Sequence, residues 1–334
     1  MSNKNLSKSN IILCITSVFL MILFIISFTK INSNNVLKDK RKPVKTAVIN
    51  PKNIDKITRM QIYEGNGDSK KITLIKINNL WYTDTDPFIK NSQNQDKMDF
   101  LIPAEQIKVS QMLEYFSQTI NVYKRSEKLK EKNDFGLTDS STIHLRYYMD
   151  GEIFNEVLFG KTDFAKTSRY MMSKTNTTVY EISTNIDQFL TMVEQNWTEP
   201  YIISQVILGK INASDIQKIK ITEYDNENQF TKLLVPSDER FLQISSKLLE
   251  LRHGGKGKIM ENENPSLPVF KLEYELGNKC SITQIFYPVE RTSENDVTEY
   301  TIITEYSKPE HKTVRNVSYK ISAWTFDKII ELTD

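Results

Sequence analysis

The side chains best suited to nucleophilic, acid–base or metal chemistry are few in this sequence. It contains three histidines, His144, His253 and His311, and two cysteines, Cys14 and Cys280. Two cysteines cannot supply a disulfide framework or a multi-cysteine metal site, and three scattered histidines leave little for a metal centre. The composition therefore argues against a metalloenzyme, and the sequence assigns no catalytic, cofactor-binding or metal-binding residue.

Two short motifs look like nucleotide-binding or kinase sequences but lack the neighbours that such sites need. HGGKGK at residues 253–258 is glycine-rich, yet a P-loop needs a Gly, four residues and then Gly-Lys-Ser/Thr between a strand and a helix. This motif follows an expected helix and has no hydroxyl residue, so we predict a helix C-cap and a flexible turn. Asp134–Gly136 reads DFG without the catalytic or glycine-rich loop of a kinase, so Gly136 is expected to form a turn before the next strand.

The remaining polar residues do not single out a reaction. His144 lies in an alternating strand pattern, His253 at a helix end and His311 in a polar loop, so each is expected to pack or to face solvent. No Ser or Cys stands in a Gly-x-Ser-x-Gly elbow, and the spacing of the many carboxylates marks no acid–base pair. The 44 basic and 42 acidic residues give a net charge of +2, too small a field for nucleic acid, so no nucleic-acid partner is expected.

The N-terminal residues predict a membrane anchor. No charged residue occurs between Lys8 and Lys30, and residues 11–28 are nearly all Ile, Leu, Phe, Val and Met. An uncharged helix of this length reaches roughly 30 Å, one bilayer core, whereas the apolar region of a signal peptide is about 7–15 residues. No small-residue cleavage site follows, so we predict an uncleaved transmembrane signal-anchor within residues 1–30, with Cys14 facing lipid. A cleaved signal peptide with a long apolar region is the alternative.

Residues 31–53 predict a basic linker. They contain six basic residues, one acidic residue and two prolines, without apolar periodicity. Charge leaves the orientation ambiguous, because Lys4 and Lys8 favour a cytoplasmic N-terminus while the linker puts more positive charge on the other flank. An N-terminal span before a large domain usually acts as an uncleaved signal. We therefore expect a single-pass protein of the cell membrane whose soluble part is extracytoplasmic.

The soluble part reads as two copies of one pattern. IDKITRMQIYE around Ile57 recurs as DIQKIKITEYD around Ile216, 159 positions later, and each is expected to open a strand. In both copies a second strand, a helix, two hairpins and a short closing helix follow in the same order. The polar loop at residues 84–102 has no counterpart in the second copy. Because identity between the copies is sparse, a chance pairing of two α+β units is the alternative.

Periodicity and turn residues place the main elements. A helix is expected from Pro103 and another after Ser237, each with one apolar face that covers a sheet. Hairpin turns are expected at residues 150–151 and 277–278. The apolar helix positions are Val109, Met112, Leu113, Phe116, Ile120 and Tyr123 in the first copy, and Phe241, Ile244, Leu248 and Leu251 in the second. The closing helices are expected around Ile186, Phe189, Leu190 and Val193, and around Trp324, Phe326, Ile329 and Ile330.

The expected fold class is therefore α+β, with an N-terminal transmembrane helix followed by two tandem, duplicated units of antiparallel strands with covering helices. The expected division is an anchor segment at 1–30, a linker at 31–53, a first unit at 54–200 and a second unit at 201–334. The breakpoint between the copies is expected between Trp197 and Ser214. Trp81 and Trp197 should be largely buried in the first unit.

The first unit resembles the bacterial membrane-anchored proteins catalogued as the domain of unknown function numbered 4340. The resemblance covers roughly residues 55–200 and implies a single N-terminal span, an exported α+β domain and frequent association with ABC-type transport systems, including those linked to gliding motility. It implies no catalytic residue. The second unit lacks a Trp81 equivalent and the FGL turn. The motifs that carry the resemblance, by their order and spacing, are ITRMQI, NLWYT, IPAEQIKVSQMLEYF, DFGLTDSSTIHLRY, VLFGKTD, RYMM, TVYEIS and QFL, which include Trp81, Phe135, Gly136, Leu137 and Gly160.

Two function classes remain. The favoured one is an accessory or binding module held at the membrane beside an ABC-type permease or another envelope protein, with the tandem units presenting sheet or loop surfaces to that partner. The alternative is a cell-envelope hydrolase whose site is built from dispersed carboxylates that the sequence does not reveal. A deep polar cleft with converging carboxylates or histidines would favour the enzyme. No cofactor is predicted for either class.

Overall fold

The computed structural model describes residues 16–17, 20–21, 42–67, 71–84, 101–127, 129–138, 140–225, 228–257, 267–291, 294–309 and 311–333. By its contacts the chain divides at residue 44, and residues 45–334 form one compact unit with two antiparallel sheets. The fold is mostly β with few helices, which agrees with the α+β class. The predicted boundary at residue 200 falls between the two sheets and stays a prediction.

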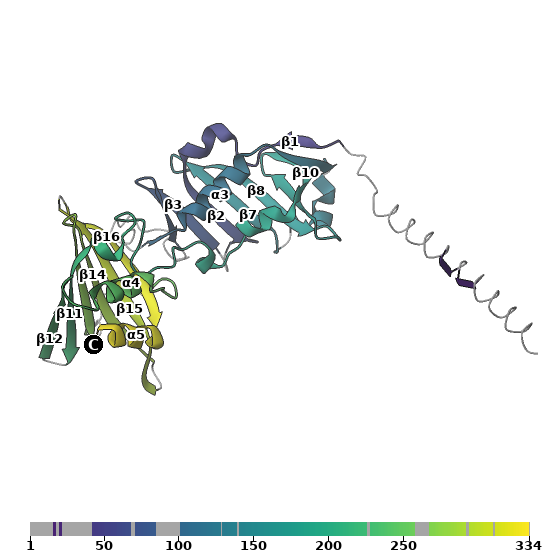
Figure 1. Cartoon of the computed structure of the whole chain (residues 1–334). Helices are drawn as coiled ribbons and strands as arrows, with labels where there is room; N and C mark the ends of the chain where they lie inside the picture. The colour runs from purple at the N-terminus through teal and green to yellow at the C-terminus, as the bar shows by residue number, and fades with distance from the viewer. Residues whose placement is uncertain are drawn as a thin grey trace, which may run out of the picture. The chain divides into compact units, whose positions relative to one another are not determined.

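The first sheet has ten strands in the order β1-β6-β10-β9-β8-β7-β2-β3-β4-β5. Its one α-helix among the described residues, α3 (Gln106–Ser117), lies across one face of the sheet and buries Val109, Met112, Leu113 and Phe116 (Figure 1). Four short 3₁₀ turns accompany this sheet: η1 (Pro51–Lys56), η2 (Leu129–Phe135), η3 (Thr184–Phe189) and η4 (Glu194–Asn196). The strands are β1 (Val44–Thr46), β2 (Ile57–Glu64), β3 (Lys71–Ile77), β4 (Leu80–Asp84), β5 (Ile102–Pro103), β6 (Ile120–Ser126), β7 (Ile143–Met149), β8 (Glu152–Thr162), β9 (Ser168–Ser173) and β10 (Asn176–Ser183).

The second sheet has six strands in the order β12-β11-β13-β14-β15-β16. In β13 alternate residues are buried, which is the period-2 pattern of a strand with one covered face. The helices α4 (Phe241–Glu250) and α5 (Ala323–Thr333) cover that face, and their apolar residues share one core with the strands (Figure 1). The strands are β11 (Ile216–Asp225), β12 (Asn228–Leu234), β13 (Phe270–Leu276), β14 (Ser281–Arg291), β15 (Glu294–Lys308) and β16 (His311–Ser322), and the turn η5 (Ala213–Asp215) precedes them.

The two sheets share one connectivity. Within the first sheet the strands β3-β2-β7-β8-β9-β10 are neighbours in the order in which β12-β11-β13-β14-β15-β16 are neighbours in the second. In chain order α4 follows β12 directly, whereas α3 follows β3 after the added strands β4 and β5. A short helix follows the last strand of each set, η3 after β10 and α5 after β16. Only the first sheet adds the flanking strands β1, β4, β5 and β6. A duplication predicts this order, and the duplication itself stays a prediction.

Several predicted elements agree with the structure. The hairpin turn at residues 150–151 joins β7 to β8, and both residues have positive φ, as a two-residue turn requires. Trp81 and Trp197 are buried, at 5% and 0% exposed. Gly136 has φ +66° and forms the expected turn. The closing helices are the 3₁₀ turn η3, where Val193 lies beyond the end, and α5.

Other expectations are corrected. Pro103 belongs to β5 and the helix begins three residues later, while Ile120 and Tyr123 lie in the edge-side strand β6 rather than in the helix. The second hairpin turn lies at residues 277–278 as expected, since Lys279 N donates to Leu276 O, and the residue with positive φ is Lys279. His311 begins β16 instead of lying in a loop. Leu251 is the C-cap residue of α4 rather than part of it.

The HGGKGK motif is also corrected, since it forms no helix cap. The described part of it runs along β16: Gly254 N donates to Lys320 O, Lys320 N donates to Gly255 O, and Gly257 N donates to Ser318 O. At Gly257 a Cβ atom would lie 2.5 Å from the backbone oxygen of Tyr319 and 2.5 Å from Ser318 Oγ. The glycine is thus required by close approach of two backbones and not by a phosphate.

No helix within the described ranges is long and apolar enough to cross a membrane. The predicted span at residues 11–28 lies outside those ranges, apart from residues 16–17 and 20–21, as do residues 31–41 of the predicted linker. The rest of that predicted linker is described: Val44–Thr46 form β1 of the first sheet, and Val48 and Ile49 are buried in the first core. Residues 85–100 of the predicted polar loop lie outside them too.

Candidate functional site

The face of the first sheet opposite α3 carries polar side chains because of strand alternation. In β2, Met60 and Ile62 point into the core that α3 covers, so Arg59, Gln61 and Tyr63 point to the other face. We call this the open face. Tyr63 and Gln61 are nonetheless buried, at 6% and 2% exposed, because their neighbours on the next strands lie over them.

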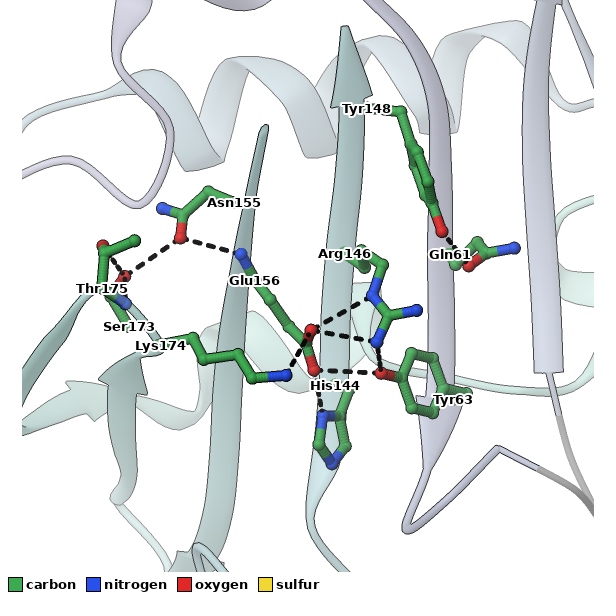
Figure 2. Close-up of polar contacts among 10 residues, drawn as sticks. All are labelled: Gln61, Tyr63, His144, Arg146, Tyr148, Asn155, Glu156, Ser173, Lys174 and Thr175. Atoms are coloured by element: carbon green, nitrogen blue, oxygen red, sulfur yellow. Dashed lines mark hydrogen bonds and ion pairs between the residues drawn. The ribbon is translucent and has the colours of Figure 1, made fainter. Parts of the chain in front are cut away.

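The neighbouring strands bring complementary groups to the same face. In β7, His144, Arg146 and Tyr148 alternate with the buried Leu145. Arg146 pairs with Glu156 of β8, so the guanidinium and the carboxylate lie side by side. Figure 2 shows that Tyr63, His144 and Arg146 converge on Glu156 from one side and that Lys174 approaches from the other. We call these five residues the Glu156 cluster.

Glu156 is the centre of the cluster and is 3% exposed. Its Oε1 accepts hydrogen bonds from His144 Nδ1 (2.7 Å) and from Tyr63 OH (3.0 Å). Its Oε2 accepts from Arg146 Nε (3.1 Å), Arg146 Nη2 (3.0 Å) and Lys174 Nζ (3.1 Å). Arg146 Nη2 also donates to Tyr63 OH (2.6 Å), and the ring of Tyr63 stacks on that of His144 with centroids 4.6 Å apart. Both carboxylate oxygens are therefore fully used by donors.

These surroundings fix the charge of Glu156. Burial alone would raise its pKa, but hydrogen bonds from His144, Lys174 and Tyr63 and the charge of Arg146 outweigh burial and lower the pKa to about 2. Burial and the hydrogen bond to Glu156 raise the pKa of Tyr63 to about 12. At neutral pH the carboxylate is thus ionised and the phenol neutral.

A second group of residues extends the cluster along the open face. Tyr148 OH lies 2.6 Å from the amide of Gln61, and the guanidinium of Arg59 lies 5.1 Å from the centre of the Tyr148 ring. With the Gln61 amide turned so that its nitrogen faces Tyr148, its oxygen accepts from Arg59 Nη2 (2.7 Å) and Lys71 Nζ (3.1 Å). The Glu156 cluster together with Arg59, Gln61, Lys71 and Tyr148 forms what we call the open-face stripe. Two of its four Lys or Arg side chains contact the buried carboxylate of Glu156, and the other two contact the amide of Gln61.

The segment that contains Phe135 and Leu137 covers a further part of the open face, over β8, β9 and β10. Leu137 packs with Leu158, Met172 and Val179 in a small separate apolar core. Phe135 stacks near Tyr170, with centroids 4.7 Å apart. This segment crosses β8 at Gly160, where a Cβ atom would lie 2.1 Å from Phe135 O. The stripe is therefore bordered by a closely packed cover.

The equivalent face of the second sheet carries different chemistry. There Glu273 of β13 takes the place of Arg146 by register and forms ion pairs with Lys220 (3.2 Å) and Lys271 (2.9 Å). Hydrogen bonds from these lysines lower the pKa of Glu273 against the opposing effect of burial. Its side chain is 31% exposed, whereas that of Glu156 is 3% exposed. The buried cluster is thus a property of the first unit.

A second buried polar group surrounds Glu199, which is 5% exposed. Its carboxylate accepts from Ser204 Oγ (2.6 Å) and from Gln205 N (2.6 Å). Its backbone oxygen accepts from His253 Nε2 (2.6 Å), and Gly255 N donates to His253 Nδ1 (2.9 Å). Such bonding requires the neutral Nε2–H form of the histidine.

The pKa values around Glu199 follow from burial. Burial, with a smaller contribution from the charge of Glu105, raises the pKa of Glu199 to about 7 against the hydrogen bonds from Ser204 and Gln205. Burial lowers the pKa of His253 to about 4. His253 therefore packs inside the protein, stacked 4.5 Å from the ring of Tyr319.

The open-face stripe can hold a partner or ligand by charge and hydrogen bonding. Glu156, ionised at neutral pH, cannot donate a proton there, and the neutral Tyr63 serves as donor and acceptor. The His144–Glu156 pair is the one feature that resembles part of a hydrolytic triad. In the described part of the chain no group of three or more His, Cys, Asp and Glu side chains is arranged to hold a metal ion.

The sequence analysis predicted no site residue. The structure brings together side chains whose positions in the sequence did not indicate that they are in contact. His144 lies in the cluster, His253 lies beside Glu199, and the side chain of His311 is outside what the structure describes. The detectable signal was alternation, since polar residues occupy every second position in β2 and β7. It does not show which carboxylate they meet.

Comparison with known proteins bears on the resemblance read over residues 55–200. No curated protein and no solved structure matches this chain. A family model does match, beginning at residue 97, ahead of α3, and ending at residue 250, with α4. The matched segment includes His144, Arg146, Glu156 and Lys174 but not Tyr63. Over residues 97–250, then, the chain is similar to the family described as Domain of unknown function (DUF4340).

Proposed function

We propose that this protein is a membrane-anchored, extracytoplasmic binding module that docks onto a partner through the open-face stripe. The partner in this proposal is the permease of an ABC-type transport system. The observation that carries the docking proposal is the stripe itself, in which Arg146 and Lys174 bind Glu156 while Arg59 and Lys71 reach the neighbouring amide of Gln61.

The geometry of the stripe supports binding. Its polar groups are held by hydrogen bonds to one another, so few side-chain rotations are lost when a partner arrives. Tyr and Arg, which dominate it, are the residues most enriched at protein interfaces. The excess of positive charge suits an acidic surface, and charge complementarity of this kind speeds association and selects partners.

The proposed membrane anchor and the proposed partner are inferred from the sequence. Residues 11–28 are uncharged and long enough for one span, and the 13 residues from 31 to 43 that precede β1 would reach roughly 20 Å as a flexible coil. That distance would keep the first unit near the external face of a membrane protein. The similarity to DUF4340 supports an ABC-type partner only through what that resemblance implies.

The test is copurification from mild detergent after crosslinking in membranes, followed by mass spectrometry. The full chain should recover an ABC-type permease, and the double variant Arg59→Glu/Lys174→Glu should recover it at least fivefold less. Both residues are exposed and outside the core. The matched control is Lys161→Glu/Lys210→Glu, which reverses two exposed lysines elsewhere and should leave recovery unchanged. Equal loss in both variants would contradict docking through the stripe, and recovery of only unrelated abundant proteins would contradict the permease.

The second candidate function is a cell-envelope hydrolase, and the His144–Glu156 contact of 2.7 Å is the observation that favours it. In that case the purified full chain would hydrolyse ester or amide substrates. His144→Gln would abolish the activity while Lys161→Glu/Lys210→Glu, which changes no residue of the Glu156 cluster, would retain it. Hydrolysis with this dependence would favour the enzyme over the binding module.

A further inference from the structure

A hollow on the second unit, lined by none of the residues of the open-face stripe, lies between α4 and α5. It has a volume of about 470 Å³ and is lined on one side by residues of α4 and its ends and on the other by residues of α5. The lining residues used below are Arg240, Lys247, Trp324, Lys328 and Glu331. We call this hollow the α4–α5 groove. Its size lies in the range of ordinary ligand sites.

Trp324 is the unusual residue of the groove. Its side chain is 70% exposed, whereas Trp81 and Trp197 are 5% and 0% exposed. The next aromatic residue of α5, Phe326, points into the core and stacks with Tyr300 at 3.9 Å. The helix thus buries one aromatic and presents another, although a large exposed indole is unfavourable in water.

The charges of the groove are partly uncompensated. Lys328 pairs with Glu331 at 2.6 Å and lies 5.9 Å from the centre of the Trp324 ring. Arg240 and Lys247 are exposed, and neither forms an ion pair with any residue in the described ranges. Glu250 also lines the groove, so its three cations and two carboxylates give a net charge of +1, and Arg240 and Lys247 are the two cations outside any ion pair of the described residues.

We propose that the α4–α5 groove binds an acidic peptide segment of a protein partner, with one apolar side chain of that segment against Trp324 and its carboxylates on Arg240 and Lys247. Aromatic and Arg anchors bordered by charged residues are typical of the energetic centre of protein interfaces. The site lies on helices held by the second core, so its groups are fixed before a ligand arrives. This inference is independent of the stripe and of the permease.

Trp324 provides the readout. Among the three tryptophans it alone is accessible to acrylamide, so quenching of the full chain reports on the groove. The probe is a synthetic capped peptide, Asp-Glu-Leu-Phe-Glu-Asp, and the control peptide carries Lys at each acidic position. The acidic peptide should protect Trp324 from acrylamide in a saturable manner, and raising the salt concentration should weaken its binding.

Variants locate the binding. Arg240→Glu/Lys247→Glu should weaken binding of the acidic peptide at least tenfold, and Lys161→Glu/Lys210→Glu should change it less than twofold. Binding to Trp324→Ala, measured by calorimetry because the fluorophore is lost, should fall at least fivefold. If a charge-reversed chain does not fold, as judged by circular dichroism, Arg240→Gln/Lys247→Gln takes its place.

Several results would overturn the proposal. They are equal binding of the lysine peptide, equal loss in both double variants, and no protection at millimolar acidic peptide. Protection by a neutral oligosaccharide such as maltotriose, without protection by the acidic peptide, would instead assign the groove to a glycan.

Discussion

Two buried carboxylates of this protein have opposite pKa shifts because their neighbours differ. Glu156 is surrounded by Arg146, Lys174 and two further donors, and these lower its pKa. Glu199 meets only a hydroxyl and a backbone N–H, so the cost of burying its charge dominates and the pKa rises. At the residue scale, then, equal burial has opposite consequences for the dependence of stability on pH.

Glu156→Gln should reduce the stability of the folded state at neutral pH. The lowered pKa means that Glu156 contributes stability above its unfolded value of about 4.5, and that this contribution is lost as the pH falls toward about 2. Because Lys174 and part of Arg146 face solvent, we expect a loss of about 1–2 kcal/mol at pH 7. Urea unfolding at pH 7, 4 and 2.5 measures it.

The difference between wild type and Glu156→Gln should shrink as the pH falls. Glu127→Gln is the matched control, since Glu127 pairs with Lys124 at an exposed site and should contribute little at any pH. A difference that stays constant from pH 7 to pH 2.5 would show that packing rather than charge causes the loss.

Glu199→Gln should have the opposite dependence on pH. A carboxyl group whose folded pKa of about 7 exceeds its unfolded value of 4.5 lowers stability as the pH rises between these values. The free energy of unfolding of the variant, relative to that of wild type, should therefore rise by roughly 3 kcal/mol between pH 4.5 and pH 8. Urea unfolding of both proteins across this range measures the change.

His253 obscures this effect in wild type alone. Its lowered pKa of about 4 makes stability fall as the pH drops below about 6.5, which opposes the contribution of Glu199. The histidine is present in both proteins, so its contribution cancels in the difference. A difference between Glu199→Gln and wild type that does not change with pH would contradict the raised pKa.

At the element scale, alternation predicts the strands but not the cluster. The turn at Asp150–Gly151 pairs Met149 with Glu152, and continuing this register would place Asn155 opposite Arg146. A bulge between Tyr147 and Tyr148 shifts the register by one residue and brings Glu156 to the open face instead. Nothing in the local pattern of polar and apolar residues marks the bulge.

The strands β5 and β6 are not predicted, because their residues carry local sequence signals of a helix. Ile120 and Tyr123 continue the helical spacing of α3, yet they form β6 because the sheet offers them strand partners. Pro103, a common first residue of helices, is the last residue of the edge strand β5, where a missing N–H is tolerated. In contrast, the helical face of α4 and the alternation of β13 suffice to predict both elements.

Gly160→Ala should destabilise the first unit. The added Cβ would lie 2.1 Å from Phe135 O, a backbone atom that cannot rotate away, so the segment that covers β8 must shift. We expect a loss of about 1–3 kcal/mol in urea unfolding. Gly254→Ala is the control, because its Cβ would meet its nearest neighbour at 3.6 Å, an ordinary contact. Equal stability of the two variants would mean that the segment containing Phe135 can shift away from β8 without destabilising the protein.

At the scale of the whole molecule, a shared connectivity carries different chemistry. The six-strand order recurs in both sheets, but the first unit holds a buried cluster at the position where the second holds exposed lysine–glutamate pairs. The exposed aromatic groove lies on the second unit instead. If the units arose by duplication, their surfaces have diverged toward different tasks while their cores kept one strand order.

The last prediction concerns the side of the membrane on which residues 31–334 lie. The uncharged run that ends at Lys30 predicts an uncleaved anchor with residues 31–334 outside the cytoplasm. Lys210→Cys places a thiol at an exposed position, whereas the native Cys280 is buried and Cys14 lies within the predicted span. A membrane-impermeant maleimide should therefore label the variant, but not wild type, in intact spheroplasts, and a cytoplasmic thiol protein should stay unlabelled. Labelling of the variant only after lysis would place the folded unit inside, and a mature N-terminus near residue 30 would show that the segment is removed.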